Sequence, residues 1–353
     1  MGSLINGVGS YIPEKIVKNS DFLTHQFYSD FNTKIEEETA SIIRKFEKIT
    51  GIAERRYVNE NQNNDEIALS AAQKALAASS INKEELDYLI VAHNFGNVSF
   101  GSNKTDLLPS IATRVKHALE IENNNCIAYD LIFGCPGWVE ALIHAHLFIK
   151  SGAAKHCLVI GAETLSRVVD NDDRDAMIFS DGAGACVLSA SDDDSKGILA
   201  HATQSFTKDE SHYLYNDKSF SGSGEADSRY IRMQGRKIYE FALNHVPNAM
   251  KTALEKSGVP LKNIKKVLLH QANEKMDQAI IDRFYALYEQ EAPEGIMPMS
   301  INTLGNSSVA TVPTLLDLIL KQKLEGHQIE IGDHVIFASV GAGMNINAVV
   351  YRF

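Results

Sequence analysis

The chain has 353 residues, of which 44% are apolar and 22% are charged, and its formal net charge is −11. These values are typical of a globular enzyme with two domains or one large fold. The acidic balance argues against general nucleic-acid binding, which depends on a basic surface. No apolar run approaches the roughly 20 residues of a membrane span, so we expect no membrane partner.

The four cysteines, at positions 126, 135, 157 and 186, are too few and too scattered for a disulfide framework. None belongs to a Cys-x-x-Cys pair and clustered zinc ligands are absent, so we expect no metal and no other cofactor. The first residues also lack a basic region followed by an apolar core, which a secretory leader would have. We therefore expect a cytoplasmic protein.

The first half of the chain alternates apolar strands with amphipathic helices. It contains predicted strands at 4–12, 88–92, 126–133, 156–161 and, after a Gly-rich turn, up to 188, with helices at 67–78, 110–120 and 137–150. Residues 21–50 are polar with helical propensity, and we interpret them as surface helices. Short apolar strands between helices favour an α/β fold, with a parallel or mixed sheet covered on both faces.

The second half repeats this order. It contains predicted helices at 236–256, 275–288 and 312–323 and strands at 265–269, 334–339 and 345–352. In the first half a strand is followed by His93-Asn94, and in the second half a strand is followed by His270-Gln-Ala-Asn273. Each half also contains a Gly-Ala-Gly turn before a strand. We therefore predict a duplication with halves at 1–190 and 191–353. Between them, the polar segment 191–230 predicts a boundary and a mobile insertion.

Cys135 lies where an apolar strand gives way to a helix, in the sequence Phe-Gly-Cys-Pro-Gly-Trp. Proline is favoured at the first turn of a helix, so a helix is expected to begin at or just after Cys135. The free N–H groups and the dipole at that end would lower the pKa of the thiol and favour the nucleophilic thiolate. A buried structural cysteine is the competing interpretation, and this stretch alone does not decide between them.

Two further polar residues stand at the ends of predicted elements. His270 follows an apolar strand, and Asn306 lies in a Gly-Asn-Ser-Ser turn. Either one, taken alone, also fits an ordinary role, as one of 12 histidines or as a turn residue. Functional residues of α/β sheets gather beyond strand ends, so we expect both side chains to meet Cys135.

Several motifs together resemble those of the β-ketoacyl-acyl-carrier-protein synthase III family of the thiolase superfamily. They are Leu131–Trp138, His270-Gln-Ala-Asn, Thr303-Leu-Gly-Asn-Ser-Ser, Phe179-Ser-Asp-Gly-Ala-Gly and the last Gly-Ala-Gly turn, and the resemblance runs almost end to end. It implies a thiolase-like five-layered αβαβα fold made of two βαβαβαββ halves, and a homodimer.

The resemblance also implies a chemistry. Cys135 would accept an acyl group from a thioester, and a malonyl- or 3-ketoacyl-type extender on acyl carrier protein would then enter. His270 and Asn306 would hold the extender carbonyl and stabilise the enolate that attacks the acyl group. The backbone N–H groups of Cys135 and Ala342 would form the oxyanion hole.

Some positions depart from the family pattern. Lys45 and Ile49 replace a Trp and an Arg that help hold coenzyme A, although Arg174 matches a coenzyme-binding Arg. This favours an acyl carrier protein as donor. Leu108 replaces an aromatic residue that caps the acyl pocket across the dimer, and Trp138 follows the nucleophile where Phe is usual. We interpret these changes as marks of a specialised relative, such as a ketosynthase of alkylresorcinol-type lipids.

A basic rim for an acidic carrier protein is a further hypothesis, although a solvated helix face explains the same residues equally well. The candidate rim residues are Arg232, Arg236, Lys237 and Lys275. Other functions also remain open, namely a thioester hydrolase or acyltransferase of the same fold and a non-catalytic partner subunit. A degradative thiolase is disfavoured, because Val340-Gly-Ala-Gly343 lacks a second cysteine.

Overall fold

The computed structural model describes residues 1–222 and 227–353. In the described residues the main sheet has nine strands in the order β13-β14-β15-β10-β1-β9-β8-β6-β7. Their bounds are β1 Gly2–Tyr11, β6 Tyr88–Ala92, β7 Ile127–Leu131, β8 His156–Thr164, β9 Asp181–Ser191, β10 Gly197–Ser205, β13 Ile264–Leu269, β14 His334–Gly341 and β15 Asn345–Arg352. The eight described α-helices are α1 Thr39–Thr50, α2 Asn64–Ser79, α3 Ile111–Ala118, α4 Gly137–Lys150, α5 Gly235–Ser257, α6 Glu274–Ala286, α7 Ile301–Leu304 and α8 Thr311–Leu320.

The sheet consists of two similar parts. They meet only at β1 and β10, which pair in parallel through Ser3 and Gly197. The N-terminal part has five strands, which we number by their order along the chain. From the outer edge of the sheet inward they lie as third, second, fourth, fifth and first. The described strands of the C-terminal part follow the same order, with no counterpart of the third strand. At the edge where that strand would pair, the N–H of Val267 on β13 donates to the carbonyl of Ile296. This repeated topology is that of a thiolase-like fold, as predicted.

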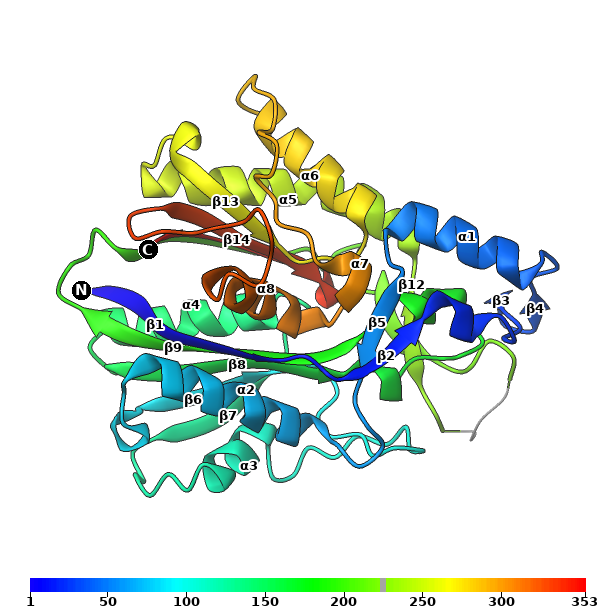
Figure 1. Ribbon diagram of the computed structural model, residues 1–353, viewed down its shortest axis with the longest axis horizontal. Coiled ribbons are helices and arrows are strands. Elements are labelled where there is room, and N and C mark those ends of the chain that lie inside the picture. Colours follow the sequence, from blue (N-terminus) through cyan, green and yellow to red (C-terminus); the bar gives the residue numbers. More distant parts are fainter. Residues whose placement is uncertain (223–226) are drawn as a thin grey trace.

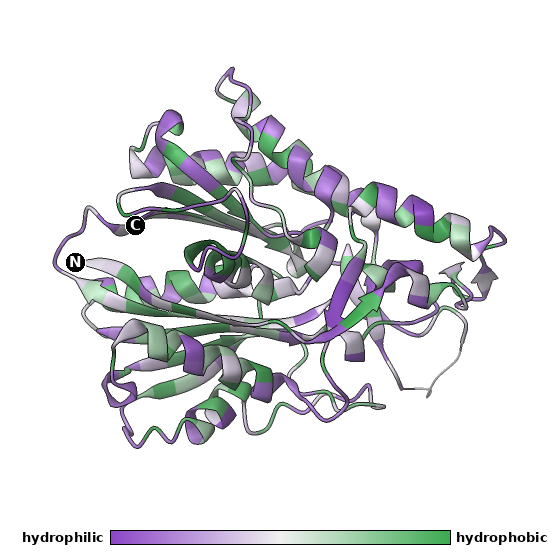
Figure 2. Cartoon of the chain, in the orientation of Figure 1, coloured by the Kyte–Doolittle hydropathy of each residue, from purple (hydrophilic) through white to green (hydrophobic). Residues whose placement is uncertain are grey.

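Helices and sheets alternate in five layers (Figure 1). α5 and α6 cover one outer face, α2 and α3 cover the other, and α4 and α8 lie between the two parts of the sheet. A helix between two sheets is apolar on most sides, and Figure 2 shows α8 mostly in the hydrophobic colour. The side chains of α4 and α8 accordingly belong to one buried cluster that both parts of the sheet share.

The expectation of surface helices over 21–50 was mostly wrong. Only α1 is an α-helix, and the preceding chain forms β2 Lys15–Lys18, a 3-10 helix at Asn19–Phe22 and the hairpin of β3 Tyr28–Asp30 with β4 Thr33–Lys34. β2 pairs with β5 Glu54–Tyr57. Tertiary contacts override the helical propensity here, because the N–H groups of Tyr28 and Asn32 donate to the carbonyls of Asp172 and Phe220.

The expectation of an insertion over 191–230 was also partly wrong. The segment contains β10, which is a full member of the sheet, and most of the hairpin of β11 Leu214–Asp217 with β12 Tyr230–Met233. Residues 223–226 of the expected insertion lie outside the described residues. The predicted division between residues 190 and 191 cuts just before the last residue of β9, and it remains a prediction.

Candidate active site

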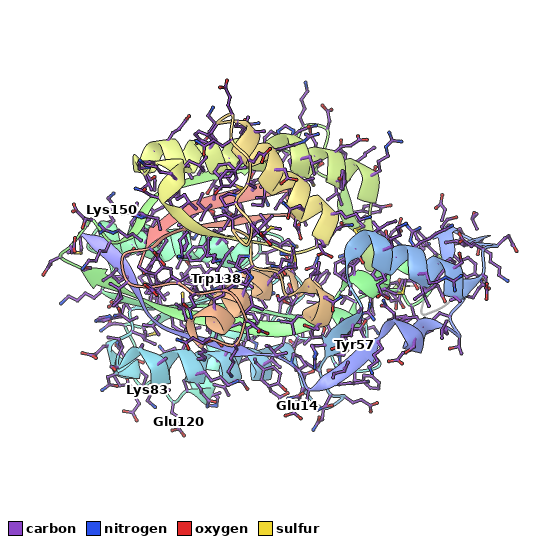
Figure 3. The ribbon with its side chains drawn as sticks, turned by 45° about the horizontal axis from the view of Figure 1, so that its top comes forward. Glu14, Tyr57, Lys83, Glu120, Trp138 and Lys150 are labelled. Atoms are coloured by element: carbon purple, nitrogen blue, oxygen red, sulfur yellow. The ribbon has the colours of Figure 1, made fainter. Side chains whose placement is uncertain are left out.

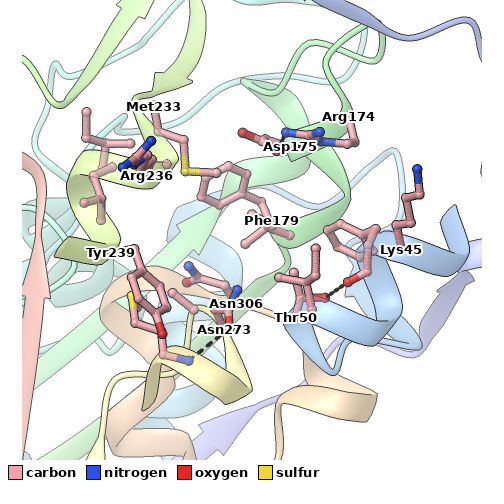
Figure 4. Close-up of a pocket in the computed structure, with 18 of the residues that line it drawn as sticks. Lys45, Thr50, Arg174, Asp175, Phe179, Met233, Arg236, Tyr239, Asn273 and Asn306 are labelled. Atoms are coloured by element: carbon pink, nitrogen blue, oxygen red, sulfur yellow. Dashed lines mark hydrogen bonds and ion pairs between the residues drawn. The ribbon is translucent and has the colours of Figure 1, made fainter. Parts of the chain in front are cut away.

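Cys135, His270 and Asn306 line one cavity of about 480 Å³. The strand ends and turns that carry them converge there from both halves of the chain. Figure 4 shows Asn306 between Thr50 of α1 and Tyr239 of α5. We call these three residues, with the loops that hold them, the floor of the cavity. The remaining lining is mostly apolar and comes from α1, α5, α6, β12 and the 3-10 helix Arg174–Ile178.

Backbone hydrogen bonds place the floor residues. His270 follows β13, and its N–H donates to the carbonyl of Ala338 on β14 at 2.9 Å. The Asn306 N–H donates to the Ile178 carbonyl at 3.0 Å, while the Asn306 carbonyl accepts from the Ser180 N–H at 2.8 Å. The side chains therefore depend on the sheet and on a fixed loop contact, which supports a preorganised site.

Beside Cys135, two turns that contain Gly134 and Gly341 pack with their backbones in direct contact. A Cβ added to Gly134, whose φ is +69°, would lie 2.6 Å from the amide nitrogen of Ala342. A Cβ on Gly341 would lie 2.5 Å from the amide nitrogen of Cys135. Only glycine permits this approach, and it brings the amides of Cys135 and Ala342 close together. Two neighbouring N–H groups are what an oxyanion hole requires.

The thiol of Cys135 does not have the lowered pKa that the sequence predicted. It faces the cavity but is surrounded by protein, and this burial raises the pKa to about 11. Hydrogen bonds from the Ser308 side chain and from its own backbone offset the rise only in part. Helix α4 begins at Gly137, just after Cys135 as predicted, but desolvation is the largest influence on the pKa of the thiol. The resting residue is a protonated thiol.

The imidazole of His270 is neutral at ordinary pH. Its side chain is buried, and desolvation lowers the pKa to about 4, although contact with the Ser308 backbone acts in the opposite direction. The buried side chain of Asn306 accepts a hydrogen bond on Oδ1 from the Ser308 N–H at 2.8 Å. A neutral imidazole and a fixed amide can both donate hydrogen bonds to a carbonyl or enolate oxygen.

Ser308 therefore bonds Asn306 and influences the pKa of both Cys135 and His270, although the sequence alone did not single it out. Its φ of +52° is uncommon for a residue other than glycine and costs conformational energy. The second serine of Gly-Asn-Ser-Ser, so close to Asn306, was the only feature of the sequence that pointed to it.

Other predicted residues lie at the mouth of the cavity or outside it. Arg174 and Arg236 line the mouth, where they pair with Asp175 and Glu240. Lys275 is exposed on α6 and is not part of the lining. Arg232 does not belong to a basic rim, since its side chain is buried and paired with Asp170 and Asp173.

Trp138 was wrongly predicted to contact substrate. Its side chain is only 1% exposed, and Figure 3 shows it inside the molecule, away from the surface residues Lys83, Glu120 and Lys150. It packs edge-on against Phe337 with ring centroids 6.2 Å apart, and its Nε1–H donates to the Val159 carbonyl at 3.4 Å. Trp138 is thus a core residue of the central layer.

The side of the cavity, which we call the wall, was largely missed from the sequence. Ile42, Phe46 and Thr50 of α1 line it together with Leu214 and Met233 of the β11–β12 hairpin. Lys45 and Ile49, where the family carries a Trp and an Arg, are also lining residues. The hydrophobic spacing of α1 was present in the sequence, but only the tertiary structure shows that it faces a cavity.

The fold and this site define a class, that of thiolase-like enzymes with a cysteine, a histidine and an asparagine in one cavity. Residues 129–206 match the family described as 3-oxoacyl-[acyl-carrier-protein (ACP)] synthase III, and residues 254–353 match its C-terminal part. A β-ketoacyl-[acyl-carrier-protein] synthase III from Cereibacter sphaeroides is 33% identical, over 99% of each chain. One from Bacillus pumilus is 30% identical, over 100% of this chain and 99% of the relative.

Solved structures agree. The 3-oxoacyl-[acyl-carrier-protein] synthase III of Aquifex aeolicus covers 100% of both chains at 30% identity, with a TM-score of 0.80. The priming β-ketosynthase of the R1128 polyketide pathway, at 24% identity and a TM-score of 0.82 over 100% of this chain and 96% of its own, shows the shared fold. The chain belongs to the β-ketoacyl-[acyl-carrier-protein] synthase III family. It is therefore a condensing enzyme of this type, an acyltransferase.

A membrane span is not found among the described helices, since none is both long enough and apolar enough to cross a bilayer. Nor do residues 1–222 and 227–353 hold three or more His, Cys, Asp or Glu side chains grouped for a metal ion.

Proposed function

We propose that the chain catalyses a decarboxylative Claisen condensation with Cys135 as nucleophile. The observation that carries this proposal is the floor itself, where a thiol, a neutral imidazole and a fixed amide meet beside two close backbone amides. These groups can serve an acyl-transfer step and a carbanion step in one place. Family membership supports the same conclusion.

In the first step the Cys135 sulfur attacks the carbonyl carbon of an acyl thioester. A new sulfur–carbon bond forms and the donor's sulfur–carbon bond breaks, and the thiol proton ends on the departing donor thiol. Since the resting thiol has a pKa of about 11, deprotonation accompanies attack, and the proton passes to the departing donor thiolate. The amides of Cys135 and Ala342 bind the oxyanion.

In the second step a malonyl-type thioester enters and loses CO2. The electron pair of the broken carbon–carbon bond forms an enolate, whose oxygen accepts hydrogen bonds from His270 and Asn306. The enolate carbon attacks the acyl carbonyl, and the Cys135 thiolate leaves and regains a proton. The product is a 3-ketoacyl thioester. A 3-ketoacyl-type extender is the second candidate, because the mostly apolar wall has space for an alkyl chain.

An acyl carrier protein is the proposed donor in preference to coenzyme A. Lys45 and Ile49 give the mouth neither the aromatic face nor the guanidinium that family members use for the coenzyme. Exposed basic residues surround the mouth instead, and an acidic carrier would find them complementary. Lys45, Arg174 and Arg236 line the cavity, and Lys237 and Lys275 are exposed next to lining residues of α5 and α6. The relatives from Cereibacter sphaeroides and Bacillus pumilus are described as β-ketoacyl-[acyl-carrier-protein] synthases III, which supports a role for a carrier protein in the reaction.

A homodimer located in the cytoplasm is also proposed. Leu108 is 87% exposed and Ile132 is 62% exposed, although both are large apolar side chains. Leu108 does not line the cavity of its own chain. A second copy that covers this surface would bury the apolar area and would bring Leu108 to the partner's acyl pocket.

Hydrolysis and a non-catalytic role receive less support. The groups that shift the pKa of His270 are its own burial and the Ser308 backbone, with no carboxylate among them. A cysteine hydrolase would place a carboxylate behind its histidine. A non-catalytic subunit would be expected to lack one of the three floor side chains, and this chain keeps all three.

Intact-protein mass spectrometry tests the proposal with matched acyl-carrier-protein and acyl-coenzyme A donors. The expected result is an acyl adduct on the wild-type chain, formed faster from the carrier donor, and no adduct on Cys135→Ala. Addition of malonyl carrier protein should then release a 3-ketoacyl product. An adduct that persists in Cys135→Ala, or no adduct with either donor, contradicts the proposal.

A further inference from the structure

A chain of buried and half-buried polar residues lies behind Cys135, and the proposed reaction does not use it. Asn94 follows the end of β6, and Glu163 lies near the end of β8 with a side chain only 1% exposed. Both residues are close to Ser308, which follows Asn306 in the loop before α8. A buried carboxyl without an ion pair is costly, so its position calls for an explanation.

The contacts connect these residues in one direction. Glu163 Oε1 accepts from the Asn94 N–H at 2.5 Å and from Asn94 Nδ2 at 2.8 Å. Asn94 Nδ2 also donates to the Ser308 Oγ at 3.3 Å, and the Ser308 side chain lowers the pKa of Cys135. An amide nitrogen has two hydrogens, so one can serve Glu163 while the other serves Ser308.

Donation by Asn94 decides what Ser308 can do. Because the serine oxygen already accepts a hydrogen bond from Asn94, its own hydroxyl hydrogen is free to point to the sulfur of Cys135. We propose that Glu163 and Asn94 are positioning residues that hold the Ser308 hydroxyl as a donor to the Cys135 thiolate. Ser308 is then the group that contacts the reacting atom.

The backbone supports this arrangement. A Cβ on Gly161 would lie 2.5 Å from the Val309 carbonyl, so the loop that carries Ser308 packs directly on β8. Glu163 is two residues further along the same strand, and its side chain therefore points to the same face as position 161. The left-handed φ of Ser308, +52°, is kept in spite of its energetic cost.

Charges around Glu163 give the arrangement a pH dependence. His93 of the loop after β6 lowers the pKa of Glu163, and Asp181 of β9 raises it, but burial is the largest influence and brings it to about 7. His93 is itself bonded to Asp130 at 2.8 Å. The Glu163 charge in turn raises the pKa of Cys135. Glu163 therefore has two opposite effects on Cys135. Its oxygen, which accepts from Asn94, favours the Cys135 thiolate, whereas the negative charge of Glu163 disfavours that thiolate.

The test is the pH profile of Cys135 alkylation by iodoacetamide, followed by intact mass. This measurement needs no acyl donor, so it can fail independently of the proposed condensation on which the role of Cys135 rests. The other described cysteines are buried, so the adduct reports on position 135. Ser308→Ala is expected to move the profile to higher pH by about one unit, and Asn94→Ala by a similar or smaller amount.

The remaining variants separate positioning from a structural effect. The Ser308→Ala/Asn94→Ala double variant should shift no further than Ser308→Ala, because both act through one hydroxyl. Glu163→Gln keeps an acceptor oxygen but removes the negative charge. The alkylation profile should therefore stay at the wild-type pH or move to lower pH, and it should lose the inflection near pH 7. If Asn94→Ala does not fold, Asn94→Leu removes the side-chain donor within nearly the same shape and adds no charge, and a shift to higher pH is again expected.

Ser307→Ala is the control, since this neighbouring serine is bonded to Thr311 at 3.4 Å and does not line the cavity. Its profile should equal that of the wild type. An unshifted profile in Ser308→Ala, or additive shifts in the double variant, overturns the proposal.

Discussion

The floor and the wall of the cavity are built in different ways. The floor depends on strand ends and on glycine turns whose backbones touch, as at Gly134 and Ala342. The wall depends on α1 and on the β11–β12 hairpin, which lie outside the main sheet and are held partly by side chains. Arg232, for example, ties the hairpin to Asp170 and Asp173. The floor can thus keep one chemistry while the wall changes the substrate.

The two regions also differ in their tolerance to change. A Cβ at Gly134 or Gly341 has no space, because it meets backbone atoms that cannot move without the sheet. On the wall, Lys45 and Ile49 are exposed at the mouth and can be replaced without disturbing the core. Substitutions in the floor should therefore reduce the rate, and substitutions in the wall should mainly change substrate preference.

Gly134→Ala should have the largest effect, because it breaks the floor at its closest approach. The added carbon would displace the Ala342 amide, so loss of an oxyanion donor is expected to reduce acylation about 100-fold or more. Rates of adduct formation at saturating donor would measure this. Gly152→Ala is the matched control, since Gly152 also has a positive φ, +79°, but open space around it. Equal losses of acylation rate in Gly134→Ala and Gly152→Ala would contradict the role of the close contact between Gly134 and Ala342.

His270→Ala should separate the two steps that the floor supports. Because His270 is proposed to stabilise the enolate, condensation should fall about 100-fold while the acyl adduct on Cys135 still forms. Single-turnover assays, with adduct and product followed separately, check this. If the adduct and the product decline together, the assignment of His270 to the second step is wrong.

The Lys45→Trp/Ile49→Arg double variant should change the wall alone. An aromatic face and a guanidinium at the mouth are expected to improve acyl-coenzyme A as donor by about tenfold, through stacking and ionic contacts. The ratio of acylation efficiencies for coenzyme and carrier donors measures the effect. Lys48→Trp, on the same helix but outside the cavity lining, is the control. No change in the ratio would argue that the mouth does not select the donor.

Leu108→Phe should give the smallest effect, a shorter preferred acyl chain with the overall rate changed only a few-fold. The larger side chain would shorten the partner's pocket in the proposed dimer. Competition between donors of different chain length measures the preference, and sedimentation measures the oligomeric state. An unchanged preference in a dimeric variant would reject the role of Leu108.

The sequence predicted the sheet and its helices well where hydrophobic period and length agree. The strand before Cys135 and the helix after it were expected at 126–133 and 137–150, close to the observed β7 and α4. It failed at 21–38, where polar residues with helical propensity form strands and turns instead. There the backbone hydrogen bonds go to residues far along the chain, and no local pattern contains that information.

The sequence by itself determined the family and the fold class and named Cys135, His270 and Asn306 as candidate site residues, because spaced motifs survive as a linear pattern. The common cavity of these residues, the burial that raises the pKa of Cys135 and the place of Trp138 in the core were decided by the tertiary structure. Desolvation depends on everything that surrounds a group, so the linear sequence could suggest a helix N-terminus at Cys135 but not the burial of its thiol.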